Sequence, residues 1–271
     1  MEENVGFDMI FDTHSHYDDK QFDTDRDELL KGLYAAGVER VVDVGADLAS
    51  SERAAALSEK YENVLAAVGI HPDSAFEADD SGIERLGTLA KNKKVVAIGE
   101  IGLDYHWMVC EKEVQENAFR RQIHLAAELS LPVIIHSRDA AEDTYRIMKD
   151  EEANICGGVV HCFSYSAEMA LKYLEMGMYI GIGGVLTYKN GRKLKEVAAA
   201  VPMERIVLET DCPYLAPDPH RGKRNDSSYI RYVAEELARI KNISYDEVVG
   251  ITRANALKMY GLDKNIQRYY T

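Results

Sequence analysis

A regular alternation of short apolar runs and amphipathic helical patterns is the feature that most constrains the fold of this chain. The runs are rich in Val and Ile and apolar throughout, which is typical of parallel strands buried on both faces. Eight of them occur, at 9–13, 40–44, 64–68, 95–98, 132–135, 155–160, 178–182 and 205–208. Helical patterns follow each run, the first four at 25–36, 50–61, 82–91 and 112–129. Eight strand–helix units with no linker between them predict a (β/α)8 TIM barrel.

The chain continues past the eighth unit with further helical signals. Ser227 or Ser228 is expected to cap one helix, and Ser244 with Glu247 forms a capping box for a second. Gly261 is expected to stop this last helix. Its apolar face is expected to close the barrel rather than to bind a partner. The prediction is therefore an α/β fold, a TIM barrel with an extra C-terminal helix.

One domain over residues 1–271 is the simplest organisation, because this length fits one large α/β barrel and no low-complexity segment divides it. A doubly wound open sheet is the main structural alternative, since periodicity alone does not show that a sheet closes. No GxGxxG follows the first run, and no phosphate-binding GxxxxGK motif occurs. Their absence from the sequence weakens a nucleotide-binding open sheet.

Charge and composition narrow the class of protein. The formal net charge of −14 argues against a protein that coats nucleic acid through a broad basic surface, although bound ions would add local positive charge. No apolar run approaches the roughly 18 residues of a membrane helix, and Met1–Asn4 is acidic, unlike the start of a signal peptide. The four cysteines form no CxxC pair, so reduced thiols are expected. We expect a cytoplasmic protein without membrane contact, with a monomer favoured.

Two histidines at the end of the first run provide the strongest functional signal. His14 and His16 are two residues apart, so on a strand both imidazoles point to the same side and can reach one ion. In TIM barrels the ends of the strands meet at one face, where the active site lies. Further donors follow later runs at this predicted face: Glu100, His136, His161 and Asp211. Imidazole and carboxylate donors suit Zn²⁺ or Mn²⁺, and carboxylates also admit Mg²⁺. The six residues predict one metal cluster, in which one carboxylate could bridge two ions.

Each member of the predicted cluster also has an ordinary explanation. A single His after a strand is more often a hydrogen-bonded polar residue than a ligand. Glu100 lies between Gly99 and Gly102, which by themselves could mark a turn, and Asp211 could begin a turn before Pro213. Six such coincidences at the strand ends of one barrel are hard to explain independently.

Other polar residues at the same predicted rim are candidates for holding substrate. His71 ends the third run, where it would face substrate or shape a turn. Arg138 would contact a phosphate through two nitrogens or form a surface ion pair. Arg221, Lys223 and Arg224 belong to the only dense basic stretch of an acidic chain, in the loop after the eighth run, and would form a phosphate cradle.

Neighbours of the predicted ligands carry further expectations. Tyr105 and Trp107, after the fourth run, would stack on a base or pack in the core. Glu209, two residues before the last predicted ligand, would orient a ligand from behind. Cys162 and Cys212 adjoin predicted ligands, and both are expected to be buried structural thiols.

Nine segments spread over nearly the whole chain carry a family pattern. They are Phe11–His16, Gly69–Pro72, Gly99–Tyr105, Pro132–Arg138, His161–Ser164, Gly183–Thr187, Leu208–Leu215, Arg221–Asn225 and Thr252–Ala256. Together they resemble the TatD family of metal-dependent deoxyribonucleases, within the wider amidohydrolase-like barrels. One departure is Asp226-Ser227, where many relatives have an acidic residue followed by Pro; it touches a loop and no predicted ligand.

The resemblance implies how the cluster is divided. By position, it implies two divalent ions, Mg²⁺ or Mn²⁺ with Zn²⁺ as a further option, bridged by Glu100 where many relatives in the wider group have a modified lysine. The implied ligands are His14, His16 and Asp211 for one ion, and His136 and His161 for the other. It also implies a nuclease on DNA, often a 3′-to-5′ exonuclease.

These observations lead to one hypothesis and two alternatives. The hypothesis is a deoxyribonuclease that hydrolyses phosphodiester bonds at single-stranded ends, with Glu100 and Asp211 catalytic and Asp211 accepting the proton of the attacking water. Arg138 and the basic loop would hold flanking phosphates. The first alternative is a hydrolase of esters or amides, including aminoacyl-tRNA, because the same ions serve that chemistry. The second is a non-catalytic interaction protein with a vestigial site.

Overall fold

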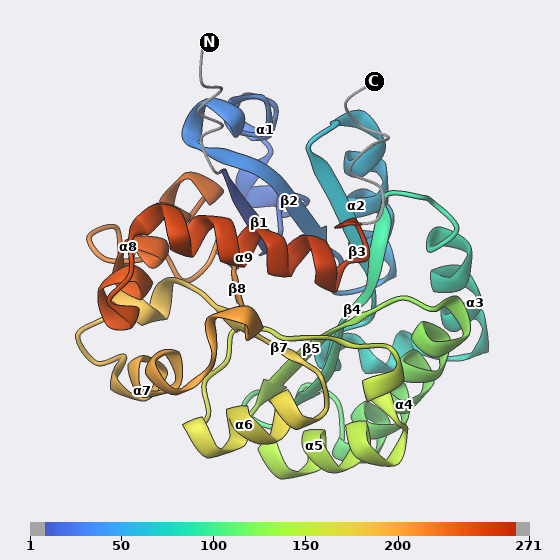
Figure 1. Cartoon of the computed structure of the whole chain (residues 1–271). Helices are drawn as coiled ribbons and strands as arrows, with labels where there is room; N and C mark the ends of the chain where they lie inside the picture. The colour runs from blue at the N-terminus through green and yellow to red at the C-terminus, as the bar shows by residue number, and fades with distance from the viewer. Residues whose placement is uncertain (1–8, 264–271) are drawn as a thin grey trace.

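Eight parallel strands form the centre of the computed structural model, which describes residues 9–263. They are β1 Ile10–Ser15, β2 Val38–Val44, β3 Val64–Val68, β4 Val95–Asp104, β5 Val133–Arg138, β6 Gly158–Val160, β7 Tyr179–Ile182 and β8 Ile206–Leu208. Each pairs with the next in chain order, and the helices surround them (Figure 1). The last seam closes just past β8, where the amide of Asp211 donates to the carbonyl of His14 at 2.9 Å and the amide of His16 to the carbonyl of Cys212 at 2.8 Å. The predicted barrel is confirmed, and the open sheet is wrong.

Helices follow the strands in alternation. They are α1 Arg26–Gly32, α2 Leu48–Lys60, α3 Asp80–Leu89, α4 Lys112–Leu129, α5 Ala141–Asp150, α6 Ala167–Glu175, α7 Arg192–Ala200, α8 Ile230–Lys241 and α9 Tyr245–Met259. The first predicted helix is the least accurate. The segment 25–36 divides into α1 and a short 3₁₀ turn, Tyr34–Ala36, which ends at Gly37 with a φ of +81°. Helix α4 begins and ends where the sequence predicts.

Three strands reach further than their apolar runs. Strands β1, β4 and β5 continue through the polar residues at the barrel rim, so that Glu100 and His136 lie within strands rather than after them. The glycines beside Glu100 do not make a turn. A Cβ atom on Gly99 would lie 2.5 Å from the Cβ of Ile134, and one on Gly102 would lie 1.9 Å from the carbonyl oxygen of His136. These glycines therefore let β5 approach β4 closely beside the predicted ligands.

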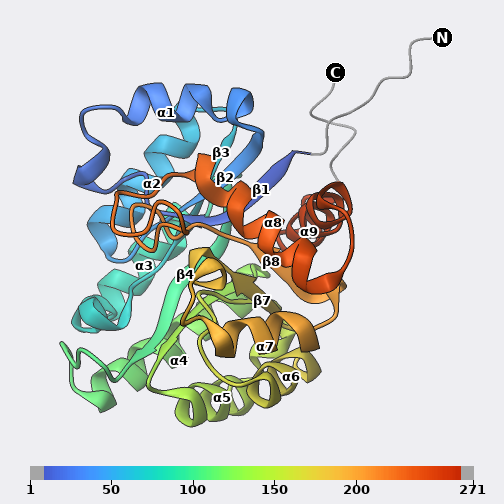
Figure 2. The same cartoon turned by 90° about the vertical axis from the view of Figure 1, so that its left-hand side faces the viewer.

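Helix α9 closes the barrel at the end where the strands begin, as predicted. Its residues Leu257 and Met259, together with Tyr260 directly after it, pack with the inward-facing strand residues, among them Phe11. The hydroxyl of Tyr260 donates to the carbonyl of Thr13 at 2.8 Å inside the barrel. Figure 2 shows α9 at one end and the loop after β8, in orange, at the other. The ends of α9 also match the prediction. Its capping box, Ser244–Glu247, is present, and Gly261 follows the helix with a φ of +66°.

The predicted cap of the preceding helix is wrong. The side chain of Asp226 accepts from the amide of Ser228 and begins a 3₁₀ turn, Ser227–Tyr229, which leads into α8. Ser227 is buried instead, where its hydroxyl donates to the carboxylate of Asp12 at 2.6 Å and its amide donates to the hydroxyl of Tyr17. A buried carboxylate needs such donors, and this need outweighs the local preference of serine for a cap.

Two sequence predictions reach beyond the described residues. The acidic start Met1–Asn4 lies outside them, and so do both ends of the 1–271 domain. Within residues 9–263, no helix combines the length and the apolar character that a membrane span requires. The cytoplasmic location and the favoured monomer stay predictions.

Candidate metal centre

A pocket of about 1300 Å³ opens at the end of the barrel where the strands finish. Five of its lining residues belong to the predicted cluster: His16, Glu100, His136, His161 and Asp211. Glu100 lies at the floor of the pocket and is almost fully buried. His14 lies behind this floor with no exposed surface. The structure therefore brings together all six residues that the sequence proposed as ligands.

Glu100 divides the cluster into two halves. One oxygen, Oε1, lies 2.7 Å from Nδ1 of His136 and 2.7 Å from Nε2 of His161. The other, Oε2, lies 3.5 Å from Nε2 of His14 and 3.9 Å from Nε2 of His16. Each carboxylate oxygen thus faces its own pair of imidazoles.

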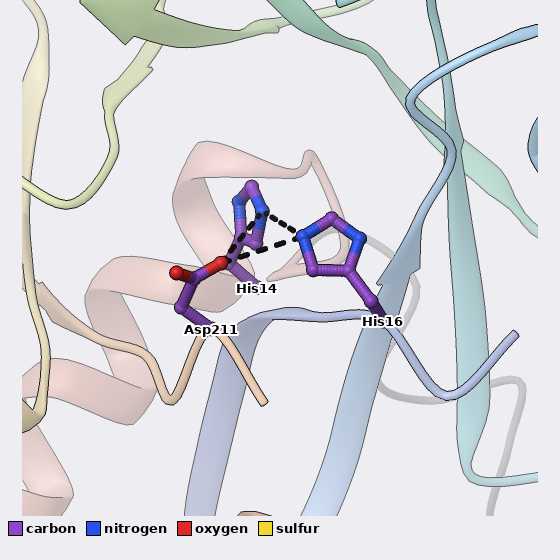
Figure 3. Close-up of side chains that lie close together, drawn as sticks. All are labelled: His14, His16 and Asp211. Atoms are coloured by element: carbon purple, nitrogen blue, oxygen red, sulfur yellow. Dashed lines mark hydrogen bonds and ion pairs between the residues drawn. The ribbon is translucent and has the colours of Figure 1, made fainter. Parts of the chain in front are cut away.

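Asp211 completes the half that contains His14 and His16. Its Oδ1 lies 3.8 Å from Nε2 of His14 and 3.4 Å from Nε2 of His16, and the two ring nitrogens are 3.1 Å apart (Figure 3). Asp211 has a φ of +56°, and its carbonyl accepts from the amide of Tyr214, so it does begin a turn. The turn and the proposed ligand are compatible, because the same backbone aims the carboxylate at the histidines.

Hydrogen bonds behind the cluster fix the orientation of two imidazoles. Nδ1 of His16 donates to the carbonyl of Val44 at 2.7 Å, so Nε2 is the nitrogen that faces Asp211 and that can bind an ion once it gives up its proton. In His136 the roles are reversed, since Nε2 donates to Oδ2 of Asp104 at 3.1 Å and Nδ1 faces Glu100. Partners of this kind orient metal-binding histidines.

Asp104 is the functional residue that sequence reasoning missed. It is buried at the end of β4, and its Oδ1 accepts from the amides of His106 and Trp107. Burial opposes its ionisation, but the hydrogen bonds from His136 and from these amides outweigh burial and lower the pKa of Asp104 to about 2. The available signal was its spacing: four residues past Glu100 on the same strand, it projects from the same side of β4.

The buried carboxylates make this site attractive to positive charge. Burial alone would lower the pKa of His16, but hydrogen bonding and charge from Asp211 raise it to about 10. For His136, the hydrogen bonds to Asp104 and Glu100 likewise outweigh burial and raise its pKa to about 9. The pKa of Glu100 stays well below its usual range, because the surrounding histidines outweigh its burial. A buried group of carboxylates and imidazoles that favours positive charge fits divalent cations.

His71 also lies at the cluster. Its ring meets that of His136 edge to face at 4.4 Å, and its Nε2 lies 3.9 Å from Oε1 of Glu100. Nδ1 of His71 accepts from the amide of Asp73 at 3.2 Å, so a neutral ring carries its proton on Nε2. Burial lowers the pKa of His71 to about 4 and keeps the ring neutral. His71 thus presents an N–H group to the pocket, and it also begins the 3₁₀ helix Pro72–Glu77, so both sequence interpretations apply.

The aromatic candidates separate into one at the pocket and one away from it. The hydroxyl of Tyr105 lies against carboxylates of α4 and α5, at 3.4 Å from Glu116 and 3.2 Å from Asp143, and Tyr105 does not line the pocket. Trp107 does line the pocket. The side chain of Tyr105 thus points to the helical layer, and its contact with substrate stays a prediction.

The basic candidates separate in the same way. Arg138 lines the pocket and lies over the Trp107 ring, with its guanidinium carbon 5.4 Å from the ring centroid. Arg224 instead forms a bidentate ion pair with Asp25 at the start of α1, at 2.9 and 2.5 Å. Arg221 lies over the ring of Tyr188. Neither of these two arginines lines the pocket, and exposed Lys223 does not line it either. The structure therefore does not bring the three basic side chains together at the pocket, because Arg221 and Arg224 contact other partners.

Glu209 and the two cysteines lie beneath the rim. Glu209 is fully buried, and its Oε1 accepts from the amide of Cys162 at 2.5 Å, so it fixes the backbone next to His161 without bonding that ring. Burial raises the pKa of Glu209 to about 7. Cys212 is buried, as expected. Cys162 is only partly buried and lines the pocket, unlike the prediction, because its φ of +44° interrupts the extended backbone.

The sequence and the structure of this chain are similar to those of known proteins. Residues 11–261 match the family described as TatD related DNase. The uncharacterized metal-dependent hydrolase YabD of Bacillus subtilis is 45% identical over 94% of this chain and all of its own length. The 3′-5′ ssDNA/RNA exonuclease TatD of Cronobacter sakazakii is 35% identical over 93% of this chain and 97% of its own. Among solved structures, the TatD homologue YJJV of Escherichia coli K12 superposes with a TM-score of 0.87 at 30% identity, covering 93% of this chain and 98% of its own.

Proposed function

The chain belongs to the TatD-related DNase family and is a metal-dependent hydrolase, and from this premise we propose that it hydrolyses phosphodiester bonds of DNA at single-stranded 3′ ends. Relatives at about a third identity bear the name 3′-5′ ssDNA/RNA exonuclease, which supports a nucleic acid substrate. The net charge of −14 disfavours tight binding to a duplex surface and is compatible with a strand end that enters the pocket.

The observation that carries the proposal is the division of Glu100 between two pairs of histidines. We propose that His14, His16 and Asp211 hold one divalent ion, that His136 and His161 hold the other, and that Glu100 bridges them. The donor set fits Mg²⁺, Mn²⁺ or Zn²⁺. When bound, such ions lower the pKa of a coordinated water and polarise a phosphate oxygen.

The residues of the chain have separate tasks in this proposal. Asp211 is only partly covered and accepts the proton of the attacking water. The Nε2–H group of His71 points into the pocket beside Glu100 and donates to an oxygen of the phosphate as charge builds there. Arg138 has no carboxylate ion pair within residues 9–263 and contacts a flanking phosphate. Asp104 is a positioning residue that acts through His136.

The test is a hydrolysis assay on purified protein with single-stranded DNA labelled at either end. We expect Mn²⁺- or Mg²⁺-dependent shortening from the 3′ end, no turnover with chelator, and none with Asp211→Asn in the presence of metal. Duplex DNA, RNA and charged tRNA are assayed alongside. Release of the amino acid from tRNA without cleavage of any DNA would overturn the proposal and favour the ester-hydrolase alternative.

The number of ions is tested separately. Titration calorimetry of the metal-free protein with Mn²⁺ is expected to give two ions per chain, and Glu100→Gln is expected to weaken binding of both. A single ion per chain that is insensitive to this substitution would contradict the bridging role while leaving hydrolysis itself open to the first assay.

A further inference from the structure

The loop between β4 and α4 carries an exposed apolar surface at the pocket. Trp107 is 64% exposed, and Met108 and Val109 follow it with 46% and 62% exposed. Large exposed apolar groups next to a polar cavity are typical of binding sites. Of these three residues, Trp107 lines the pocket that contains the metal cluster. We propose that Trp107 is a stacking surface for a nucleobase of the bound strand, an inference that rests on the proposed nuclease function.

The backbone of Trp107 is joined to the cluster by hydrogen bonds. Asp104 accepts from the backbone amide of Trp107 at 2.9 Å through Oδ1 and from His136 at 3.1 Å through Oδ2. The buried carboxylate of Asp104 therefore bonds both the proposed metal ligand His136 and the backbone of Trp107. The backbone that carries the indole is therefore placed next to the proposed metal ligands.

The charges around Trp107 favour a nucleotide over an apolar partner. Three arginines line the pocket, and two of them are paired, Arg53 with Asp18 and Arg26 with Asp23. Arg138 is the third; it lies over the indole ring and has no carboxylate ion pair among residues 9–263. An aromatic face with an adjacent guanidinium matches a base and its phosphate, and base–aromatic stacking tolerates any base.

The ring of His106 packs against the indole of Trp107. It lies perpendicular to the indole with the centroids 4.8 Å apart, and its Nδ1 is 3.0 Å from a carboxylate oxygen of Asp139. The indole thus has a packed neighbour while 64% of Trp107 stays exposed.

Fluorescence offers a direct test, because Trp107 is the only tryptophan of the chain. With chelator present, so that nothing is cleaved, the protein is titrated with a short oligothymidylate and with an abasic strand of the same length. We expect the oligothymidylate to quench the emission and the abasic strand to leave it unchanged, with binding of both followed by anisotropy of a labelled strand. Equal quenching by both strands, or binding of the oligothymidylate without quenching, would overturn the inference.

Kinetics provide the second test. Trp107→Ala is expected to raise KM for oligothymidylate about tenfold, a loss typical of one base–aromatic stack, with kcat nearly unchanged. Trp107→Phe should restore part of the loss, and neither substitution should change KM for the abasic strand. Tyr34→Ala is the matched control, since Tyr34 is 73% exposed but precedes β2 at the opposite end of the barrel.

The two proposals fail in distinguishable ways. If the wild-type protein cleaves oligonucleotides and Trp107→Ala leaves KM unchanged, the stacking role is wrong and the nuclease stands. If the wild-type protein neither binds nor cleaves any oligonucleotide, the proposed function is wrong and the stacking role falls with it.

Discussion

The two ends of the barrel use the same strands for opposite purposes. Where the strands begin, the interior is apolar, and α9 closes it with Leu257, Met259 and Tyr260. Where they finish, the same sheet buries Glu100 and His14 among other ionisable groups. Burial of apolar surface stabilises the first end, whereas at the second the cost of burying carboxylates is offset by their pairing with imidazoles.

This difference assigns stability and activity to separate sets of residues. Substitutions at the closed end are expected to change the free energy of unfolding and leave turnover intact. Substitutions at the open end are expected to change metal binding and turnover with little loss of stability. The predictions below test that separation from the largest expected effect to the smallest.

Glu100→Gln should have the largest effect on activity. Loss of a residue that hydrogen-bonds a metal ligand typically lowers metal affinity or activity by roughly 10- to 100-fold. Loss of a ligand that both ions share should therefore reduce metal-dependent hydrolysis by about a thousandfold or more. The free energy of unfolding of the metal-free protein should fall only modestly, because the histidines lose the charge that lowers the pKa of Glu100, whereas Gln costs less to bury than a carboxylate. Hydrolysis rates and urea unfolding measure the two quantities. An unfolded variant, or a fully active one, would contradict the assignment of activity rather than stability to the open end.

Leu257→Ala should have the largest effect on stability. Leu257 is buried within the inner core, and truncation of such a leucine costs about 2–5 kcal/mol. Urea unfolding of the metal-free protein measures the loss, and kcat should remain within about twofold of wild type at temperatures where the variant is folded. A large fall in kcat in the folded variant would show that the two ends are coupled.

Asp104→Asn tests whether the carboxylate that orients His136 affects metal affinity. Asn has one acceptor oxygen, so it can accept from His136 or from the amides of His106 and Trp107 but not from both. It also lacks the negative charge that makes the His136 imidazole a better metal ligand, so metal affinity should fall by roughly 10- to 100-fold. Metal titration measures this change. Asp139→Asn is the matched control, because Asp139 also pairs with a histidine, exposed His106, but does not contact the cluster. Equal losses in both variants would indicate a general charge effect.

Arg138 and Arg224 form a natural pair for comparison at the open end. Arg138→Ala should lower kcat/KM about tenfold and reduce the salt dependence of DNA binding by about one phosphate contact, because Arg138 is available to the substrate. Arg224→Ala should leave kcat/KM unchanged and cost about 1 kcal/mol of stability, because Arg224 pairs with Asp25. The reverse pattern would indicate that the phosphate is held by the basic loop that contains Arg224, as the sequence predicted, and not by Arg138.

The sequence predicted the fold and the convergence of the proposed donors, because both follow from the order of elements along the chain. Alternation of runs and helices favours a barrel, and a barrel brings every strand end to one face. Thus His14 and Asp211, almost two hundred residues apart, could be placed together from their positions after apolar runs. The barrel topology brings these residues together, so their proximity could be predicted without knowing any side-chain contact.

The errors arose where a side chain chooses among distant partners. Arg224 pairs with Asp25, and Ser227 donates to Asp12, across about two hundred residues of sequence. No local pattern reports which carboxylate a flexible side chain meets after folding. The length of β4 was also underestimated, because the strand continues through polar residues at the rim after the apolar run has ended. The run therefore gave no indication that Asp104 faces His136.

The smallest predicted effect belongs to the helical layer, which lies outside both ends. Glu236 on α8 bonds Arg239 at 2.9 and 2.7 Å and contacts Lys195 of α7 at 3.0 Å. These bonds, led by that with Arg239, lower the pKa of Glu236 to about 2. Since an unfolded Glu titrates near about 4.3, the stabilisation is complete above that pH and is lost as the pH falls toward about 2.

Glu236→Gln should therefore cost less than about 1 kcal/mol at neutral pH, because Arg239 is largely exposed and solvent screens the pair. The gap in unfolding free energy between variant and wild type should narrow as the pH falls below about 4 and also in high salt. Turnover at neutral pH should not change. If turnover did fall, the helical layer would have to position the metal centre through α7 and α8, and activity would no longer be a property of the open end alone.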